Sequence, residues 1–206
     1  GYNDLDSVEF LKRRLSGYWT LFQPDFSPLL TVAKEEYAAL RKECEAFDAE
    51  LLADAEAFGG ADYAKLLAGA FRQSIAAHKL VADIDGTPLF FSKENFSNGC
   101  IATVDVTYPS APLYLLMQPA LLKGMLIPIL DYASSCKWRF PFAPHDLGTY
   151  PLANGQVYGG GERTEENQMP VEECGNMLIL AAALAKFSDD LSFLRKYEPV
   201  FRKWAE

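Results

Sequence analysis

A glycine pair, Gly59-Gly60, divides a long stretch of helix-forming sequence and limits most strongly what the chain can fold into. Residues 32–58 are rich in Ala, Glu, Lys and Leu, a composition that favours a helix. The apolar residues of this stretch recur every three or four positions, as on one buried face: Tyr37, Leu40, Cys44, Phe47, Leu51 and Ala55. Residues 62–80 repeat the pattern. The sequence therefore predicts two antiparallel helices, an αα-hairpin.

Further helices follow from apolar spacing and end signals. Asp6 or Ser7 caps a predicted helix that runs to Leu15, and Ser110 or Pro112 opens a short one. Residues 119–134 are apolar nearly all round, which indicates a fully buried helix. Residues 170–187 form the next, and a last helix after Asp189 or Asp190 carries its apolar residues on one stripe: Leu191, Leu194, Tyr197, Val200 and Trp204.

One β-hairpin is expected among these helices, because Asp85-Gly86 lies between two short apolar segments. The predicted class is mainly α, with antiparallel αα-hairpins and one small β-hairpin. We expect residues 1–206 to be a single α-helical domain. Its parts are an N-terminal helix and linker (1–27), a helical hairpin (28–80), the β-hairpin (81–92) and a motif-bearing helical part (93–206).

The segment from Trp138 to the helix at Pro170 has no sustained period and is predicted to be a long loop. A loop of that length inside a compact domain is usually functional or disordered. Its aromatic content argues against disorder. It also gathers most of the candidate polar residues, which are His145, Asp146, Glu162, Glu165, Glu166, Glu172 and Glu173. We therefore expect a packed loop that carries a carboxylate-rich site and is followed by a helix.

Two acidic positions have a structural interpretation beside the functional one. Asp105 lies between Val104 and Val106 in a predicted loop, where it is either hydrogen-bonded for structure or tuned for chemistry. Taken alone, its position favours the structural interpretation. Glu172 and Glu173 fall in a first helical turn, where carboxylates offset the helix dipole. At most one of these two glutamates can face a given pocket.

Composition excludes several classes of protein. A net charge of -9 over 206 residues argues against nucleic acid or an anionic membrane as partner. The apolar segments are too short to span a bilayer, and the first residues carry no signal-peptide pattern. Four scattered cysteines, without a C-x-x-C pair, predict isolated buried thiols, although a disulfide stays open. No metal-ligand spacing occurs, so we expect neither a metal nor a cofactor.

Several long motifs resemble the central domain of the glutaminase A family, first known from fungal enzymes. They are L-L-A-D-A-E-A-F-G-G-A-D-Y-A-K-L-L, F-R-Q-S, F-S-K-E-N, V-D-V-T-Y-P-S-A-P-L, H-D-L-G-T-Y-P-L-A-N-G-Q and M-P-V-E-E-C-G-N-M-L-I-L. The resemblance runs from about Asp48 to the end. It implies an (α/α)6 toroid, a secreted or periplasmic protein, and hydrolysis of L-glutamine to L-glutamate and ammonia. Residues 155–170 are longer than the corresponding family segment.

The candidate site residues all lie in the shared motifs. We expect Asp105, Asp146 and Glu173 to be catalytic and to lie close together. The expected substrate-binding residues are His145, Tyr150, Glu172 and Tyr108. In amide hydrolysis, Asp146 or Glu173 would activate water, with Asp105 as the acid.

Two other hypotheses stay open at this point. Paired carboxylates also suit a glycoside hydrolase, in which Tyr108, Trp138 and Tyr150 would stack on sugars. Alternatively, the chain is a non-catalytic partial domain, since a toroid needs about twelve helices and the patterns predict about seven. The expected partners are a small-molecule substrate and the remaining domains of the same polypeptide. For the isolated chain we expect a homodimer that covers its apolar faces.

Overall fold

The computed structural model describes residues 6–23, 25–188 and 191–206, and it is mainly helical, which confirms the predicted class. The described residues cluster into two compact units. Residues 19–76 form the first unit, and residues 6–18 and 77–206 form the second. Within the described residues, no helix is both long enough and apolar enough to cross a membrane. All four cysteines are free, and two of them, Cys100 and Cys174, are buried.

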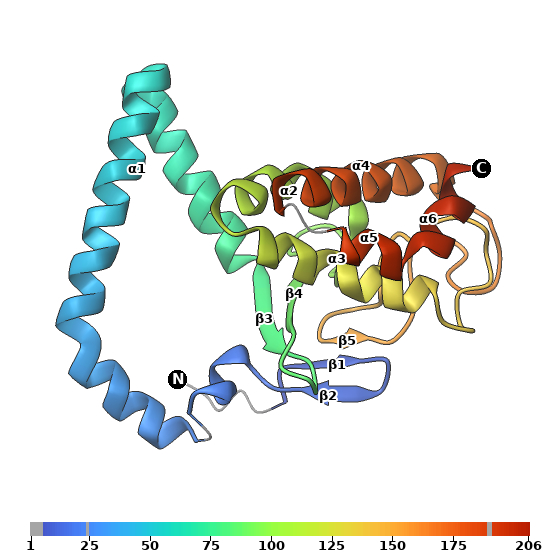
Figure 1. Ribbon diagram of the computed structural model, residues 1–206, viewed down its shortest axis with the longest axis horizontal. Helices are drawn as coiled ribbons and strands as arrows, with labels where there is room; N and C mark the ends of the chain where they lie inside the picture. The colour runs from blue at the N-terminus through green and yellow to red at the C-terminus, as the bar shows by residue number, and fades with distance from the viewer. Residues whose placement is uncertain (1–5, 24, 189–190) are drawn as a thin grey trace. The chain divides into compact units, whose positions relative to one another are not determined.

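The first unit is dominated by α1 (Phe26–Ala76), which bends back on itself (Figure 1). The helix is interrupted at Gly60, where φ is 81° and ψ is 177°. Glycine adopts this conformation readily because it lacks a Cβ atom. The rings of Phe47 and Phe71, one from each arm, meet with their centroids 5.8 Å apart. The predicted αα-hairpin and its glycine turn are therefore confirmed.

The predicted burial of the first arm's apolar stripe is wrong for most of its length. Ala55 is buried, but Tyr37, Leu40 and Phe47 are 61%, 47% and 42% exposed. Phe47 contacts the second arm through Phe71 even so. However, the described part of this unit holds one hairpin and the 3-10 helix η1 (Tyr18–Leu21), which is too little structure to cover that face.

The second unit begins with a β-hairpin where a helix was predicted, so that prediction is wrong. β1 (Val8–Phe10) pairs antiparallel with β2 (Arg13–Leu15) and parallel with β5 (Leu152–Ala153), which gives the strand order β2-β1-β5. Leu11 and Lys12 form the turn with φ of 46° and 67°. The side chains of Val8, Phe10 and Leu15 are buried. The helix prediction rested on the spacing of Val8, Leu11 and Leu15, whereas the burial of Val8 and Phe10 follows the alternation of a strand.

The hairpin predicted around Asp85-Gly86 is confirmed. β3 (His78–Ala82) pairs antiparallel with β4 (Pro88–Ser92), with His78 opposite Ser92 and Ala82 opposite Pro88. Gly86 has φ of 85°, as such a turn requires.

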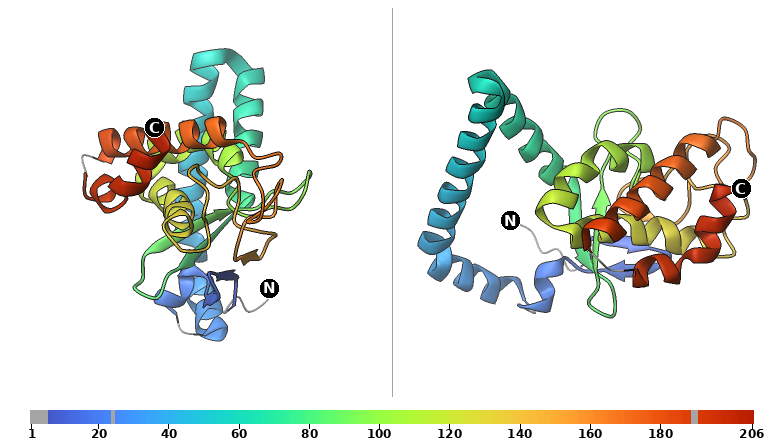
Figure 2. Two further views of the ribbon diagram at one scale, coloured as in Figure 1. Left: turned by 90° about the vertical axis from the view of Figure 1, so that its right-hand side faces the viewer. Right: turned by 45° about the horizontal axis from the view of Figure 1, so that its top comes forward.

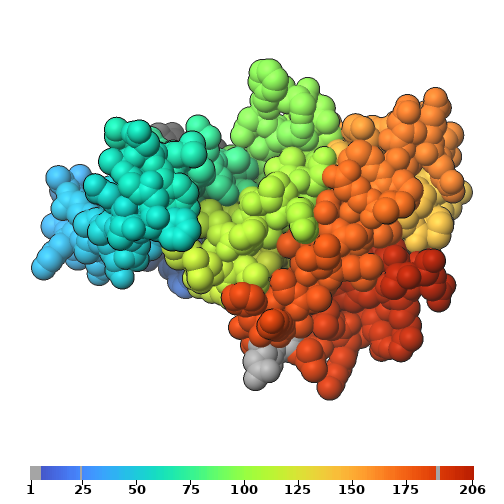
Figure 3. Space-filling view, turned by 90° about the horizontal axis from the view of Figure 1, so that it is seen from above, coloured from blue at the N-terminus to red at the C-terminus, as the bar shows by residue number. Residues whose placement is uncertain are grey.

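α3 (Pro119–Ala133) is the central helix of the second unit, and its predicted burial is confirmed. It packs against β4, α2 (Val104–Met117) and α4 (Pro170–Ser188). α2 and α4 also pack against each other and lie side by side in Figure 3. The approach of α3 to β4 is close, because a Cβ atom on Gly124 would lie 2.7 Å from the carbonyl oxygen of Pro88.

Three helix boundaries differ from prediction. The second arm of α1 ends at Ala76 rather than at residue 80, because the following residues form β3. α2 begins at Val104 rather than at Ser110 or Pro112, and it contains two prolines, Pro109 and Pro112. Burial of one face of α2 outweighs the cost of the two prolines to the helix. Asp105 therefore lies in the first turn of a helix and not in a loop. The single predicted last helix is in fact two, α5 (Ser192–Lys196) and α6 (Glu198–Ala205), with a proline in the first turn of α6. Its predicted caps, Asp189 and Asp190, lie outside the described residues.

The connection from α3 to α4 is the packed loop that its aromatic content predicted. Trp138 is buried and donates a hydrogen bond from Nε1 to the carbonyl oxygen of Phe142 at 2.6 Å. The ring of Phe140 stacks on that of Phe142 with centroids 5.4 Å apart. Figure 2 shows the loop passing beside the helices before it enters α4. The loop thus has its own packing and can hold side chains in place.

The Gly124 contact generates a stability prediction. Gly124→Ala should lower the free energy of unfolding by about 1–3 kcal/mol, since the added methyl overpacks the α3–β4 contact. The measurement is urea unfolding of the 206-residue chain, followed by tryptophan fluorescence. Gly175→Ala is the control, because a Cβ atom there meets nothing within 4 Å and alanine favours helix by about 1 kcal/mol. Equal stability of the two variants would contradict the close packing.

Candidate active site

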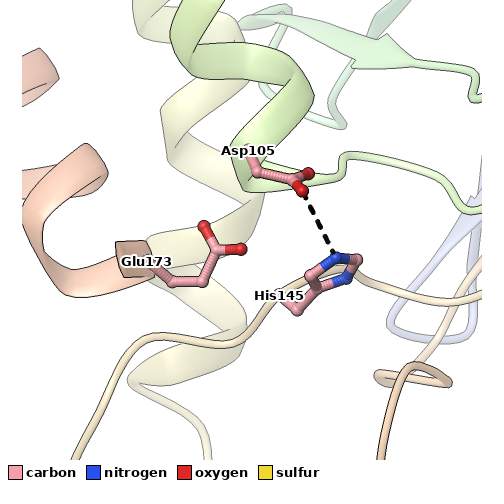
Figure 4. A group of neighbouring side chains, drawn as sticks. All are labelled: Asp105, His145 and Glu173. Carbon is pink, nitrogen blue, oxygen red and sulfur yellow. Dashed lines mark ion pairs between the residues drawn. The ribbon is translucent and has the colours of Figure 1, made fainter. Parts of the chain in front are cut away.

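Three segments that are distant in sequence bring one histidine and two carboxylates together (Figure 4). Asp105 comes from the first turn of α2, His145 from the long loop, and Glu173 from the first turn of α4. One donor atom from each residue lies within 4.8 Å of the other two. We call these residues the three-donor cluster. His145 and Glu173 are buried, whereas Asp105 is about one third exposed.

Backbone hydrogen bonds hold two of these segments in register. The amide of Val104 donates to the carbonyl oxygen of His145 at 2.8 Å. The amide of Leu147 donates to Ile101 at 3.0 Å, and Ile101 donates to Gly148 at 2.9 Å. Residues 101–104 therefore lie alongside residues 145–148. This pairing places the start of α2, and with it Asp105, next to the His145 side chain.

Asp146 is completely buried and accepts four hydrogen bonds. Oδ1 accepts from the amides of Gly148 at 2.8 Å and Val157 at 3.0 Å. Oδ2 accepts from the amide of Tyr158 at 3.1 Å and lies 3.0 Å from His145 Nδ1. Both oxygens of Asp146 are thus occupied by the loop backbone and by the Nδ1 side of His145. Asp146 is not a member of the three-donor cluster.

His145 is held on three sides. Its amide donates to Gln156 Oε1 at 2.7 Å, and its ring stacks on Tyr158 with centroids 4.0 Å apart. Asp146 on Nδ1 directs Nε2 towards Asp105, whose Oδ2 is 3.8 Å away. Burial alone would lower the pKa of His145. The hydrogen bond and charge of Asp146, with the charges of Asp105 and Glu173, outweigh burial and raise the pKa overall.

Glu173 is completely buried and only weakly partnered. Its Oε2 accepts a long hydrogen bond of 3.4 Å from Asn176 Nδ2. Its Oε1 has no hydrogen-bond partner among the described residues, and the same holds for Asp105 Oδ1. Burial raises the pKa of Glu173 to about 8. Burial thus favours the protonated form of this carboxyl group.

Positive charge is scarce around these groups. Within the described residues, neither Lys nor Arg forms an ion pair with Asp105, Asp146 or Glu173. Buried carboxylates without such partners need protons or a cation to balance them. The cluster can therefore hold and transfer protons.

The other predicted substrate-binding residues are not members of the three-donor cluster. Glu172 is exposed, as expected for the neighbour of a buried residue on a helix. Tyr108 is 39% exposed on α2, one turn after Asp105. Tyr150 is half-buried, and Lys93 Nζ lies 5.6 Å from its ring centroid. Their proposed contact with substrate remains a prediction.

Sequence reasoning missed the residues that support the cluster. Gln156 and Tyr158 hold His145 from ten or more positions away, and no spacing rule marks them. Asn176 was detectable in principle, because residues three apart share a helical face with Glu173. Glu162 accepts a 2.7 Å hydrogen bond from the Tyr132 hydroxyl, which is a structural use of that carboxylate. Glu165 and Glu166 are exposed.

Comparison with known proteins gives concordant results. Residues 60–206 match the model of the glutaminase A six helical-hairpin domain, which agrees with the predicted toroid. The chain is 35% identical over 187 residues to glutaminase A of Aspergillus oryzae, which covers 90% of this chain and 26% of that protein. It is 33% identical over 167 residues to a probable glutaminase of Arthroderma benhamiae, with coverage of 81% and 19%. The chain thus spans about a quarter or less of these relatives' length.

The family match covers well over half of the chain, and it contains the whole three-donor cluster. The motifs that suggested the family from sequence lie in the same region. This chain belongs to the glutaminase A family and carries sequence of its six helical-hairpin domain.

Proposed function

We propose that the chain carries the hydrolytic site of a glutaminase, which converts L-glutamine to L-glutamate and ammonia. The observation that carries this proposal is the convergence of Asp105, His145 and Glu173 within 4.8 Å. The relatives named glutaminases support the substrate. Since the chain spans only part of those relatives, we assign the activity to the longer polypeptide.

In the proposed reaction, Asp105 removes a proton from water, and the water oxygen bonds to the side-chain carbonyl carbon of glutamine. Asp105 suits this role because it is partly exposed and its Oδ1 has no partner among the described residues. The protonated His145 stabilises the oxyanion that forms, because its Nε2 faces the reaction space.

Glu173 completes the reaction as the acid. As the carbon–nitrogen bond breaks, its proton passes to the leaving nitrogen, which departs as ammonia. A glutamate buried at 0% exposure, with its pKa raised to about 8, retains this proton at neutral pH. Asp146 acts through His145 and is therefore a positioning residue. The sequence alone suggested Asp105 as the acid and Asp146 or Glu173 as the base. The roles proposed here make Asp105 the base and Glu173 the acid.

A glycoside hydrolase is the second candidate, favoured by one observation. One carboxylate oxygen of Asp105 lies within 4.8 Å of one of Glu173, so the pair fits the close carboxyl groups of retaining enzymes, about 5–5.5 Å apart, better than the roughly 6.5–9.5 Å of inverting ones. Tyr108 is exposed one turn from Asp105 and is suited to stacking on a sugar. Assays of the longer polypeptide on glutamine and on a panel of glycosides separate the two functions.

The surroundings of the site are also proposals. We expect a secreted or periplasmic protein in which other parts of the polypeptide pack against this chain. The exposed apolar residues of α1, such as Tyr37 and Leu40, support such packing. In the chain alone, a second copy would cover them, and sedimentation would report a dimer. If the isolated chain proved inactive and the neighbouring segments of the polypeptide restored turnover, the partial-domain hypothesis would stand.

The first functional prediction concerns the two carboxylates. Asp105→Asn and Glu173→Gln should each lower kcat/KM for glutamine by at least about 100-fold, because each removes one proton-transfer group. Steady-state assays of the longer polypeptide, with circular dichroism as a folding check, make the measurement. Glu172→Gln is the matched control, since it removes the neighbouring exposed carboxylate and should retain activity. Folded and active Glu173→Gln protein would refute the assignment.

The second prediction is the pH profile. Glu173 must be protonated to act as the acid, so kcat/KM should fall as pH rises through about 8. Loss of the His145 proton acts in the same direction, since its pKa is also raised. An ordinary glutamate, with a pKa near 4.5, would already lose this function in mildly acidic solution. Assays between pH 6 and 10 test this, and a rate that increases across pH 8 would argue against Glu173 as the acid.

A further inference from the structure

The three-donor cluster offers a different kind of chemistry from proton transfer. We propose that Asp105, His145 and Glu173 bind a divalent transition-metal cation, for which Zn²⁺ is the best match. We also propose that the bound cation inhibits the hydrolytic reaction. The binding itself rests only on the donor set and its geometry. The inhibitory effect rests on the proposed hydrolytic function.

The donor set favours zinc among common divalent cations. One imidazole nitrogen and two carboxylate oxygens are ligand types that Zn²⁺ accepts at about 2.0–2.2 Å. Sites with three protein ligands leave a fourth position for water. Mg²⁺ and Ca²⁺ bind oxygen ligands and seldom use imidazole. A mixed cluster of this kind is therefore less suited to them.

Two unpartnered oxygens point independently to a ligand. Glu173 Oε1 belongs to a side chain with 0% exposure and has no hydrogen-bond partner among the described residues. Asp105 Oδ1 is also without a partner there. Figure 4 shows the Glu173 carboxyl group directed into the space that it shares with Asp105 and His145. A buried polar atom without a partner is costly, and a cation in this space would satisfy it.

The groups behind His145 are arranged as they are around metal-bound histidines. Such a histidine almost always donates its other ring N–H to a carboxylate, carbonyl or water, which orients the ring. Asp146 Oδ2 lies 3.0 Å from His145 Nδ1, and three backbone amides hold the Asp146 carboxylate. Nε2 is therefore the nitrogen presented to the cluster. This arrangement does not depend on whether the protein hydrolyses glutamine.

The three donor atoms need to move only a short way towards one another to bind a tetrahedral ion. Donors about 2.1 Å from a tetrahedral ion are about 3.4 Å from one another. His145 Nε2 and Asp105 Oδ2 are 3.8 Å apart, and every pair in the cluster is within 4.8 Å. Side-chain rotation of Asp105, the partly exposed member, brings its oxygen nearer. The cation would also balance the carboxylate charge that Lys and Arg leave unpaired in the described residues.

Binding would compete with the proposed reaction. The cation takes the Nε2 lone pair of His145 and a carboxylate oxygen of Glu173, so neither group can then carry the proton that the proposed mechanism assigns to it. Added Zn²⁺ should therefore inhibit turnover, and a chelator should restore it.

The test is calorimetric titration of the 206-residue chain with Zn²⁺ after treatment with a chelator. Cys44 and Cys136 are exposed thiols that bind zinc themselves, so the chain carries Cys44→Ser and Cys136→Ser. We expect one Zn²⁺ per chain. Glu173→Gln and Asp105→Asn should each weaken binding by more than the roughly 10- to 100-fold that loss of an outer-shell partner costs. Glu172→Gln should leave the affinity unchanged.

The outcomes separate this inference from the proposed function. No zinc binding, or equal affinity in the parent chain, Glu173→Gln and Asp105→Asn, would overturn the metal site, whatever the turnover of these variants. Site-specific binding without an effect of either substitution on glutamine hydrolysis would keep the metal site and overturn the proposed function. Asp105→Asn keeps the test valid if Glu173→Gln does not fold, because Asp105 is partly exposed.

Discussion

The Asp146 carboxylate is the interaction on which the candidate site depends. Its two oxygens gather the amides of Gly148, Val157 and Tyr158, and they also hold the imidazole of His145. Hydrogen bonds to a charged acceptor are among the stronger ones in proteins. The same carboxylate therefore folds the loop between α3 and α4 and orients the histidine. Without it, the His145 ring would keep its stack on Tyr158 but lose the hydrogen bond that directs Nε2 towards Asp105 and Glu173.

Charge balance links the two chemical proposals. Asp105 and Glu173 lie close to one side of His145, and Asp146 bonds the other side of its ring, in a region where the described residues supply no ion pair from Lys or Arg. Protons on Glu173 and His145 are one way to reduce the negative charge, and a divalent cation is another. Both use the same atoms. We therefore propose that the proton-transferring and metal-bound forms are competing states of one cluster.

Local signals were sufficient for part of the fold. Gly60 interrupts α1 with a positive φ that glycine adopts readily, and Asp85-Gly86 lies in the turn between β3 and β4. The apolar composition of α3 likewise required burial. The N-terminal hairpin was missed because its turn uses Leu11 and Lys12, which carry no usual turn signal. The start of α2 was missed because Pro109 and Pro112 obscured it, and tertiary packing overrides them.

The site shows the same division between local and long-range information. Asp105, His145 and Glu173 were recognisable because each lies in a distinctive motif. The supporting role of Gln156 was not recognisable, although it ends the same motif as His145, because Gln156 and Tyr158 reach His145 only after the loop has folded. For the same reason the sequence could not show that Asp146 is fully hydrogen-bonded. Its assignment as a positioning residue needed the three-dimensional arrangement.

The tautomer of His145 tests the central claim most directly. The measurement is NMR of the chain with nitrogen-15-labelled histidine across a pH titration. The chain has two histidines, and the resonances that are missing from the His145→Gln variant belong to His145. The account predicts that His145 titrates above the pKa of a free imidazole, and that its neutral form carries the proton on Nδ1, donated to Asp146. A neutral form protonated on Nε2, or a pKa below that of free imidazole, would contradict the account.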